Sequence, residues 1–277
     1  MHKPILFKLT NIIVAMCCYC TEITAHEFWI EPQKFVVKST EDISADLRVG
    51  QMMTGVSYGF YPRNFKRLSV KNGTKILPIT GRLGDKPAIQ IPHQGHRLVT
   101  LFITTVDNLV SYNDWSQFES FLREKNLSNA EEEHKKNNFP RSEFKEIYSR
   151  YAKALVGAGN SLGFDQKLGL ETEIVLKQNP YIENTTNGLT VTLFYNDSPR
   201  GNTQIEVFSR STNGIVKKEI FFTDDDGEAI IDVSSGTDYL VNSVIMRRPR
   251  TETGSTGSKD TSILWESLWA STTFRVP

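Results

Sequence analysis

Short segments of alternating apolar and polar residues, separated by turns, make up most of this 277-residue chain and limit what it can fold into. Residues 43–49 place Ile, Ala, Leu and Val at every second position, and residues 189–195 repeat this alternation. A period of two predicts strands with one buried face. Asn72-Gly73 is typical of a tight hairpin turn. Several such strands, separated by turns at a spacing of roughly ten residues, indicate β-sandwiches.

The segment from about residue 113 to residue 159 has a different period. Trp115, Phe118 and Leu122 fall at helical spacing, and a second apolar stripe follows at the same spacing. That stripe comprises Phe144, Ile147, Tyr148, Tyr151 and Leu155. Between the two, residues 131–136 form a charged run, which includes His134 and which we expect at the surface. The expected fold is all-β with a helical insertion: an N-terminal β-sandwich over residues 26–164, with the insertion at about 113–159, and a C-terminal β-sandwich over residues 165–277.

The first 25 residues have the organisation of a secretory signal peptide. Lys3 and Lys8 precede an apolar stretch at residues 12–20, and a polar segment then ends at Ala25. The stretch is shorter than the about 20 apolar residues that a membrane span requires. We therefore expect cleavage after Ala25 and a periplasmic or secreted protein without a transmembrane span in its mature chain. Lipidation at Cys17 and retention of the segment as an anchor are the alternatives.

Composition narrows the classes of function. All three cysteines, at positions 17, 18 and 20, lie in the expected signal peptide, so the mature chain has neither disulfides nor thiolate chemistry. The formal net charge is zero, which argues against nucleic acid as a partner. The Gly-x-Ser-x-Gly, His-Glu-x-x-His and phosphate-loop motifs are absent. We therefore expect a non-enzymatic protein.

Three histidines are candidate metal ligands. His26 would become the first residue of the mature protein and would offer its α-amine and its imidazole to a transition metal. His93 and His96 lie three residues apart before an expected strand, where both imidazoles could face one ion. The alternative for these two is an exposed loop without a ligand. Phe28 and Trp29, close behind His26, are expected to pack the first strand against the sandwich.

Two basic residues of the second expected helix are a further candidate site. Arg150 and Lys153 lie three residues apart and share one side of that helix. They could bind an anion or a carboxylate, or they could form a structural ion pair. The sequence leaves both alternatives open.

Several stretches of the sequence together resemble the DUF4198 family of exported bacterial proteins. They are residues 25–31, 150–155, 170–175 with 179–181, 223–227 and 265–274, in one order across nearly the whole mature chain. The resemblance implies an envelope protein with immunoglobulin-like or carboxypeptidase-regulatory-like β-sandwiches, related to the substrate-specific component of nickel uptake systems. The chain departs from the family pattern in two places. The family pattern often has a histidine soon after the Val-Gly pair that corresponds to Val49-Gly50, where this chain has Met52 and Met53. It often has another just before the methionine that corresponds to Met246, where this chain has Ile245.

These expectations combine into one hypothesis, an exported transition-metal-binding protein that presents nickel, cobalt or copper to a transport system in the envelope. His26 would chelate the ion through its amine and imidazole, and His93 or His96 would add a ligand. The alternative is an envelope adhesion or carbohydrate-binding β-sandwich module without metal. A copper-dependent oxidative enzyme is a third alternative.

Overall fold

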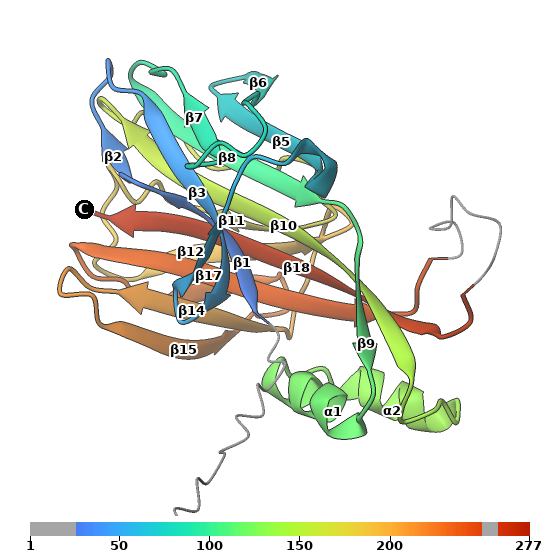
Figure 1. Ribbon diagram of the computed structural model, residues 1–277. Coiled ribbons are helices and arrows are strands. Elements are labelled where there is room, and N and C mark those ends of the chain that lie inside the picture. Colours follow the sequence, from blue (N-terminus) through green and yellow to red (C-terminus); the bar gives the residue numbers. More distant parts are fainter. Residues whose placement is uncertain (1–25, 251–259) are drawn as a thin grey trace, which may run out of the picture.

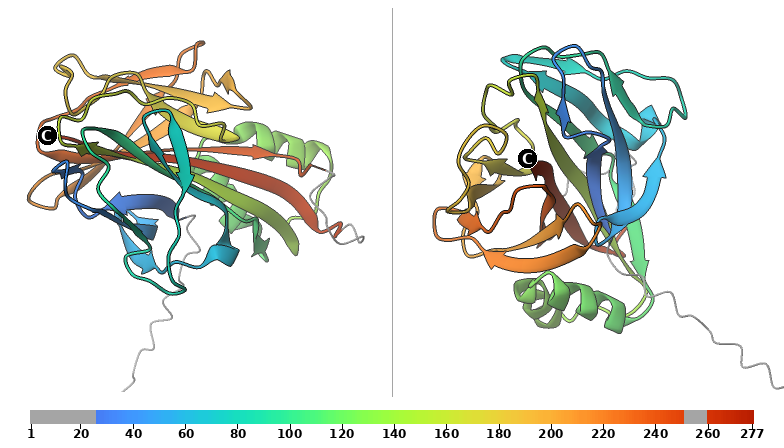
Figure 2. Two further views of the ribbon diagram at one scale, coloured as in Figure 1. Left: turned by 90° about the horizontal axis from the view of Figure 1, so that it is seen from above. Right: turned by 90° about the vertical axis from the view of Figure 1, so that its left-hand side faces the viewer.

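The computed structural model describes residues 26–250 and 260–277, and these form a mostly β fold with sheets facing one another in sandwich-like layers (Figure 1, Figure 2). The fold class predicted from the alternating sequence pattern is confirmed. The expected signal peptide, with Cys17 and Ala25, lies outside the described residues. Within the described residues, no helix combines the length and the apolar character that a membrane span requires.

The largest sheet of the described residues has ten strands and runs through both halves of the chain. Its main path is β15 (Val216–Phe222), β14 (Gln204–Arg210), β17 (Thr237–Arg247), β18 (Ile263–Val276), β10 (Phe144–Ala158), β8 (Arg97–Thr105), β5 (Phe65–Asn72) and β6 (Lys75–Pro78). Off this path, two short strands also pair with β10, namely β2 (Val36–Val37) and β9 (Asn108–Tyr112). Because β18 pairs in parallel with β10, strands from both predicted sandwiches share one sheet.

Two smaller sheets pack against this large sheet and enclose one core each (Figure 2). The N-terminal sheet contains β1 (Glu27–Pro32), β3 (Ile43–Gln51), β4 (Thr54–Tyr58) and β7 (Ile89–Ile91). The C-terminal sheet contains β11 (Thr172–Leu176), β12 (Leu189–Tyr195), β13 (Ser198–Pro199) and β16 (Glu228–Ile231). Successive residues of β10 point to opposite sides, so Ala154 and Val156 join the first core while Leu155 joins the second.

The second helix predicted from the sequence is wrong. The residues of its apolar stripe lie in β10, an extended strand of 15 residues. β10 is buried on both faces over most of its length, so apolar side chains stand at odd and at even positions alike. Some of them then fall three and four residues apart by coincidence, which imitates a helical period.

The helical part of the insertion is a short pair of helices at the lower end of the large sheet (Figure 1). α1 (Trp115–Glu124) is the first predicted helix, and Asp114 caps it by accepting a hydrogen bond from the Ser116 N–H at 2.8 Å. α2 (Ser128–Lys136) contains the charged run that was predicted as surface. The prediction fails for His134, which is 1% exposed and lies one turn after Ala130 on the buried face of α2.

Lys153 forms a buried ion pair that ties β10 to the C-terminal half. Its side chain is fully buried, and its Nζ lies 2.9 Å from Asp165 Oδ1 and 3.8 Å from Glu173 Oε2. The same Nζ donates to the Ile174 carbonyl at 3.1 Å. For Lys153, therefore, the structural ion pair is the correct alternative.

Replacing Lys153 by methionine should destabilise the protein by about 3–5 kcal/mol, because Asp165 would remain buried without its cation. Replacing Lys167, whose pair with Asp197 is exposed, should change stability by about 0–1 kcal/mol. Urea unfolding followed by tryptophan fluorescence gives both free energies. Equal effects of the two substitutions would contradict the structural role of Lys153.

Candidate functional site

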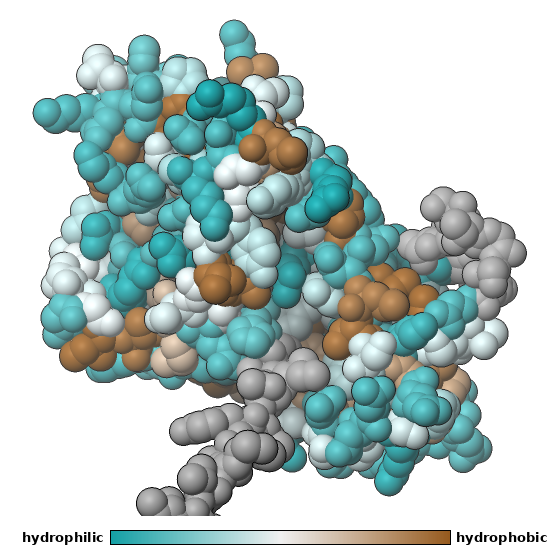
Figure 3. Space-filling view, viewed as in Figure 1, coloured by the Kyte–Doolittle hydropathy of each residue, from teal (hydrophilic) through white to brown (hydrophobic). Residues whose placement is uncertain are grey.

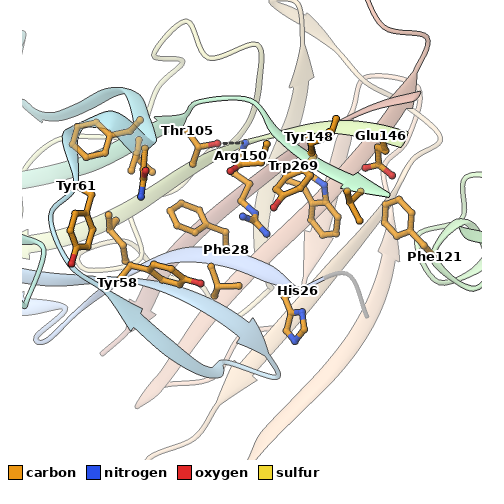
Figure 4. A pocket seen from close by; sticks show the side chains of 18 of the residues that line it. His26, Phe28, Tyr58, Tyr61, Thr105, Phe121, Glu146, Tyr148, Arg150 and Trp269 are labelled. Carbon is orange, nitrogen blue, oxygen red and sulfur yellow. Dashed lines mark hydrogen bonds between the residues drawn. The ribbon is translucent and has the colours of Figure 1, made fainter. Parts of the chain in front are cut away.

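A cavity of about 460 Å³ lies between the N-terminal sheet and the first half of β10 (Figure 4). Strands β5, β8, β9 and β18 and helix α1 complete its walls. Eight of its lining residues are aromatic, namely Phe28, Tyr58, Tyr61, Phe65, Tyr112, Phe121, Tyr148 and Trp269. A concave site with mostly apolar walls and a few polar groups is typical of small-molecule binding.

The rim of the cavity is apolar on the side of β9. Leu109 of this strand lines the cavity although its side chain is 51% exposed. Figure 3 shows apolar side chains gathered above the helices, in the region that β9 occupies in Figure 1. A ligand entering from this side would meet an apolar surface before it reached the polar groups inside.

Strand β10 supplies the charged groups of the cavity. Glu146, Tyr148 and Arg150 stand at every second position, so they share one face of the strand. The same face continues into the N-terminal core at Ala152. The pairing of β10 with β18 is irregular between Lys145 and Glu146, and such bulges commonly redirect side chains beside functional sites.

The Arg150 guanidinium has no carboxylate partner in the described parts of the chain. It lies 4.7 Å from the ring centroid of Tyr148 and 5.7 Å from that of Phe28, and its buried Nε has no hydrogen-bond partner. Burial lowers the pKa of Arg150, yet an arginine remains charged at neutral pH. Figure 4 shows the guanidinium directed into the cavity, while the Arg150 backbone N–H donates to Thr105 Oγ1 at 3.0 Å. A guanidinium in this setting can bind an anion.

Glu146 is a buried carboxyl at another part of the cavity wall. Its side chain is 2% exposed, Tyr112 donates its hydroxyl to Oε2 at 2.7 Å, and the Ser267 hydroxyl donates to Oε1. Burial raises the pKa of Glu146 from 4.5 to about 7. Burial and the neighbouring Glu146 carboxylate also raise the pKa of Tyr112, so its hydroxyl stays protonated. Near neutral pH, Glu146 is therefore divided between its neutral and its ionised form.

The end wall of the cavity is held in place by a second buried ion-pair network. Lys125, at the end of α1, places its Nζ 3.1 Å from Glu27 Oε1 and 2.7 Å from Glu206 Oε2. These contacts connect α1 to β1 and to β14. Phe121 of α1 stacks on Trp269 of β18, with ring centroids 5.6 Å apart and planes inclined by 8°. The helix therefore forms a fixed wall of a pocket that is already assembled.

The comparisons with known proteins identify the family of this chain. A family model described as "Domain of unknown function (DUF4198)" matches residues 23–247. The chain belongs to the DUF4198 family. The resemblance seen in the sequence is confirmed at this level, and the family description names no activity.

No curated protein matches the chain. Among solved structures, a similar one is described as a tetra-tandem repeat in the extending region of a large adhesion protein, with 11% sequence identity and a TM-score of 0.21. The match covers 91% of this chain and 50% of that one, so this DUF4198 chain spans about half of the other's length. A similarity at this TM-score carries no argument about function.

The predicted metal ligands lie apart in this DUF4198 protein. His26 is exposed and lines the cavity, whereas His93 is exposed with its Nδ1 3.9 Å from Asp42 Oδ1. His96 lies against Gly159, nine residues after Arg150 along an extended strand, which corresponds to about 30 Å. The structure thus does not bring His26 and His96 to one ion. Within residues 26–250 and 260–277, no group of three or more His, Cys, Asp or Glu side chains is placed to hold a metal.

The remaining sequence predictions near the cavity have mixed outcomes. Phe28 and Trp29 are buried as expected, and Phe28 also lines the cavity. His134 is part of the buried helical unit, because its Nδ1 accepts a hydrogen bond from Trp265 Nε1 at 3.0 Å. Glu146 was not singled out in the sequence. The one local signal for Glu146 in the sequence is its spacing. Glu146, Tyr148 and Arg150 stand at every second position, which would place their side chains on one face of a strand.

Replacing Glu146 by glutamine should stabilise the protein, relative to the wild type, more at about pH 8 than at about pH 4. Between about pH 4.5 and pH 7 the unfolded chain has an ionised Glu146 while the folded chain keeps it protonated, so the wild-type protein loses stability as the pH rises through this range. The full effect is about 3 kcal/mol. Urea unfolding of both proteins across this range measures it, and a difference that does not vary with pH would contradict the raised pKa.

Proposed function

We propose that this DUF4198 protein is a non-enzymatic binding protein that holds a small organic anion in the cavity at Arg150. The observation that carries the proposal is a guanidinium that lies among aromatic rings, is directed into the cavity and has no carboxylate partner within the described residues. Leaving its buried Nε without an acceptor, and its charge without a carboxylate, costs free energy in the free protein. A ligand that supplies the acceptor would recover this free energy on binding.

The surroundings of Arg150 indicate the kind of ligand. A planar carboxylate or a sulfonate can accept two parallel hydrogen bonds from a guanidinium. The aromatic walls suit an apolar or aromatic body attached to that anion. Because Lys125 and the Phe121–Trp269 stack fix one wall, little ordering would be needed on binding.

Replacing Arg150 by methionine should weaken the binding of anilinonaphthalene sulfonate at least about tenfold, because the sulfonate loses a charge-assisted hydrogen bond while the aromatic walls remain. Fluorescence titration measures the affinity, and displacement by octanoate shows that the dye occupies a site for organic anions. Replacing Arg150 by lysine should give an intermediate affinity, because the charge is kept and the planar donor pair is lost.

Arg67 offers a matched control for this experiment. Its guanidinium lies 4.5 Å from the ring centroid of Phe102, but the residue does not line the cavity. An Arg67→Met protein should bind the dye like the wild type. Equal losses in both variants, or no displaceable binding in the wild type, would overturn the proposal. A neutral oligosaccharide that binds equally to wild type and Arg150→Met would favour the carbohydrate-binding alternative instead.

Metal binding at His26 is a second candidate function, and one observation favours it. In the pairing of β1 with β3, Glu27 lies opposite Gly50, so His26 comes next to the turn that follows Gln51. Met52 and Met53 form this turn with positive φ angles of 51° and 52°, a conformation usually assigned to Asn or Gly. Met53 is buried, but Met52 is 39% exposed. A thioether beside an amine and an imidazole suits copper, and an exported protein of this kind could pass the ion to a transport system.

The His26 site is tested by titrating the mature protein with Cu(II) and Ni(II). N-terminal sequencing should first show that the exported protein begins at His26. His26→Ala should then weaken binding at least about tenfold, because the chelate ring loses its imidazole, while His93→Ala should leave the affinity unchanged. Equal affinities of the wild type and His26→Ala would exclude His26 as a ligand.

A further inference from the structure

Glu146 differs from the other buried acids of the described residues in having no basic partner. The others each pair with a lysine or an arginine, and they are Glu27, Glu206, Asp165, Glu173, Asp238 and Glu266. Glu146 accepts hydrogen bonds from two hydroxyl groups instead. A carboxylate has about four lone-pair sites, so further donors can still bind it.

Among the described residues, the cavity therefore contains one acid without a basic partner, Glu146, and one base without an acidic partner, Arg150. Glu146 and Arg150 lie four residues apart on one face of β10, which places their Cα atoms about 13 Å apart. Tyr148 stands between them on the strand, and Figure 4 shows Tyr148 and Trp269 between the two charged side chains. Each side chain is held at its own end, Arg150 over Phe28 and Tyr148, and Glu146 by the hydroxyl of Tyr112.

We propose that the ligand of this cavity is dipolar, with an anionic group bound by Arg150 and a protonated amine bound by Glu146. This inference rests on the proposed function and specifies its ligand class. The body between the two groups is apolar or aromatic, because aromatic rings form the wall between the two ends. An ω-amino carboxylate has this arrangement of charges.

An amine is favoured over a hydroxyl because of what surrounds Glu146. The groups nearby are Tyr112 from β9, Ser267 and Trp269 from β18, and Phe121 from α1, and none of these carries a positive charge. The nearby cation Lys125 lies 5.4 Å from the Trp269 ring centroid and already pairs with three other acids, Glu27, Glu124 and Glu206. A ligand ammonium would be the charge that stabilises the ionised carboxylate.

The inference is tested with octanoate and ω-aminooctanoate, together with homologues one or two methylenes shorter and longer. Isothermal titration calorimetry of the purified protein should show that the best amino compound binds at least about tenfold more tightly than the alkanoate of equal length, because it adds a charge-assisted hydrogen bond. In Glu146→Gln this ratio should fall to near one.

Glu171 provides the matched control. It accepts a hydrogen bond from the Tyr151 hydroxyl at 3.0 Å, as Glu146 does from Tyr112, but it lies outside the cavity lining. Glu171→Gln should keep the wild-type preference for the amine. A preference that survives in Glu146→Gln, or that is lost equally in Glu171→Gln, would overturn the inference.

Proton release supplies a second measurement that needs no variant. At about pH 6.5 a fraction of Glu146 is protonated, and pairing with an ammonium should drive that proton into the buffer. The binding enthalpy of ω-aminooctanoate should therefore depend on the ionisation enthalpy of the buffer more strongly than that of octanoate. If octanoate binds through Arg150 and the amine adds neither affinity nor proton release, the dipolar ligand is excluded while the proposed function stands. If neither compound binds, both are overturned.

Discussion

The position of β10 between two cores is the constraint on which the other layers depend. The strand pairs in parallel with β18 from Lys145 opposite Ile263 to Ala154 opposite Thr273, and β2 continues this edge at Gly157 and Ala158. The other edge of β10 pairs with β8 and β9. One face supplies the N-terminal core, and the other supplies Leu155 to the C-terminal core. A shift by one residue would exchange these faces, so burial on both sides specifies the register. That register in turn places three alternate side chains of its first half in the cavity.

The strands with one buried face could be predicted from the sequence, and β10 could not. In the strand at residues 43–49, alternation separates a buried from a partly exposed face, and the period of two is visible. In β10 both faces are covered by protein over much of the strand, and its charged residues stand at odd positions (Lys145, Lys153) as well as even ones (Glu146, Arg150), so they do not mark one solvent side. What decides between helix and strand there is the partner β18, which lies more than a hundred residues away in the sequence. The spacing of apolar residues within one segment gives no information about such a long-range pairing. Tertiary contacts then override the local preference of the segment.

The candidate site could be predicted in part for the same reason. Arg150 stood out as a cation that could bind an anion, and Phe28 as an apolar anchor, because each has a chemistry that is visible in one residue. The role of Glu146 depends on its burial, which follows from the contacts of β9 and β18 with β10. The structure does not bring His26 and His96 together, because His26 lines the cavity at the first half of β10 whereas His96 lies against Gly159, just beyond the end of that strand. Short sequence motifs do not reveal this separation.

Buried charged side chains have different surroundings in the cavity and in the rest of the fold. Lys125 and Lys153 pair with acids that lie outside their own helix or strand, and these pairs join segments of the fold to one another. Within the part of the chain that the structure describes, Arg150 and Glu146 have no partner of opposite charge although both line one cavity, and a chain that supplies partners elsewhere could have supplied them here. Such a local departure from the rule followed in the rest of a structure is expected at functional sites. A carboxylate from the chain beside Arg150 would remove the free-energy cost of the unpaired cation, but it would also occupy the space that an incoming anion requires.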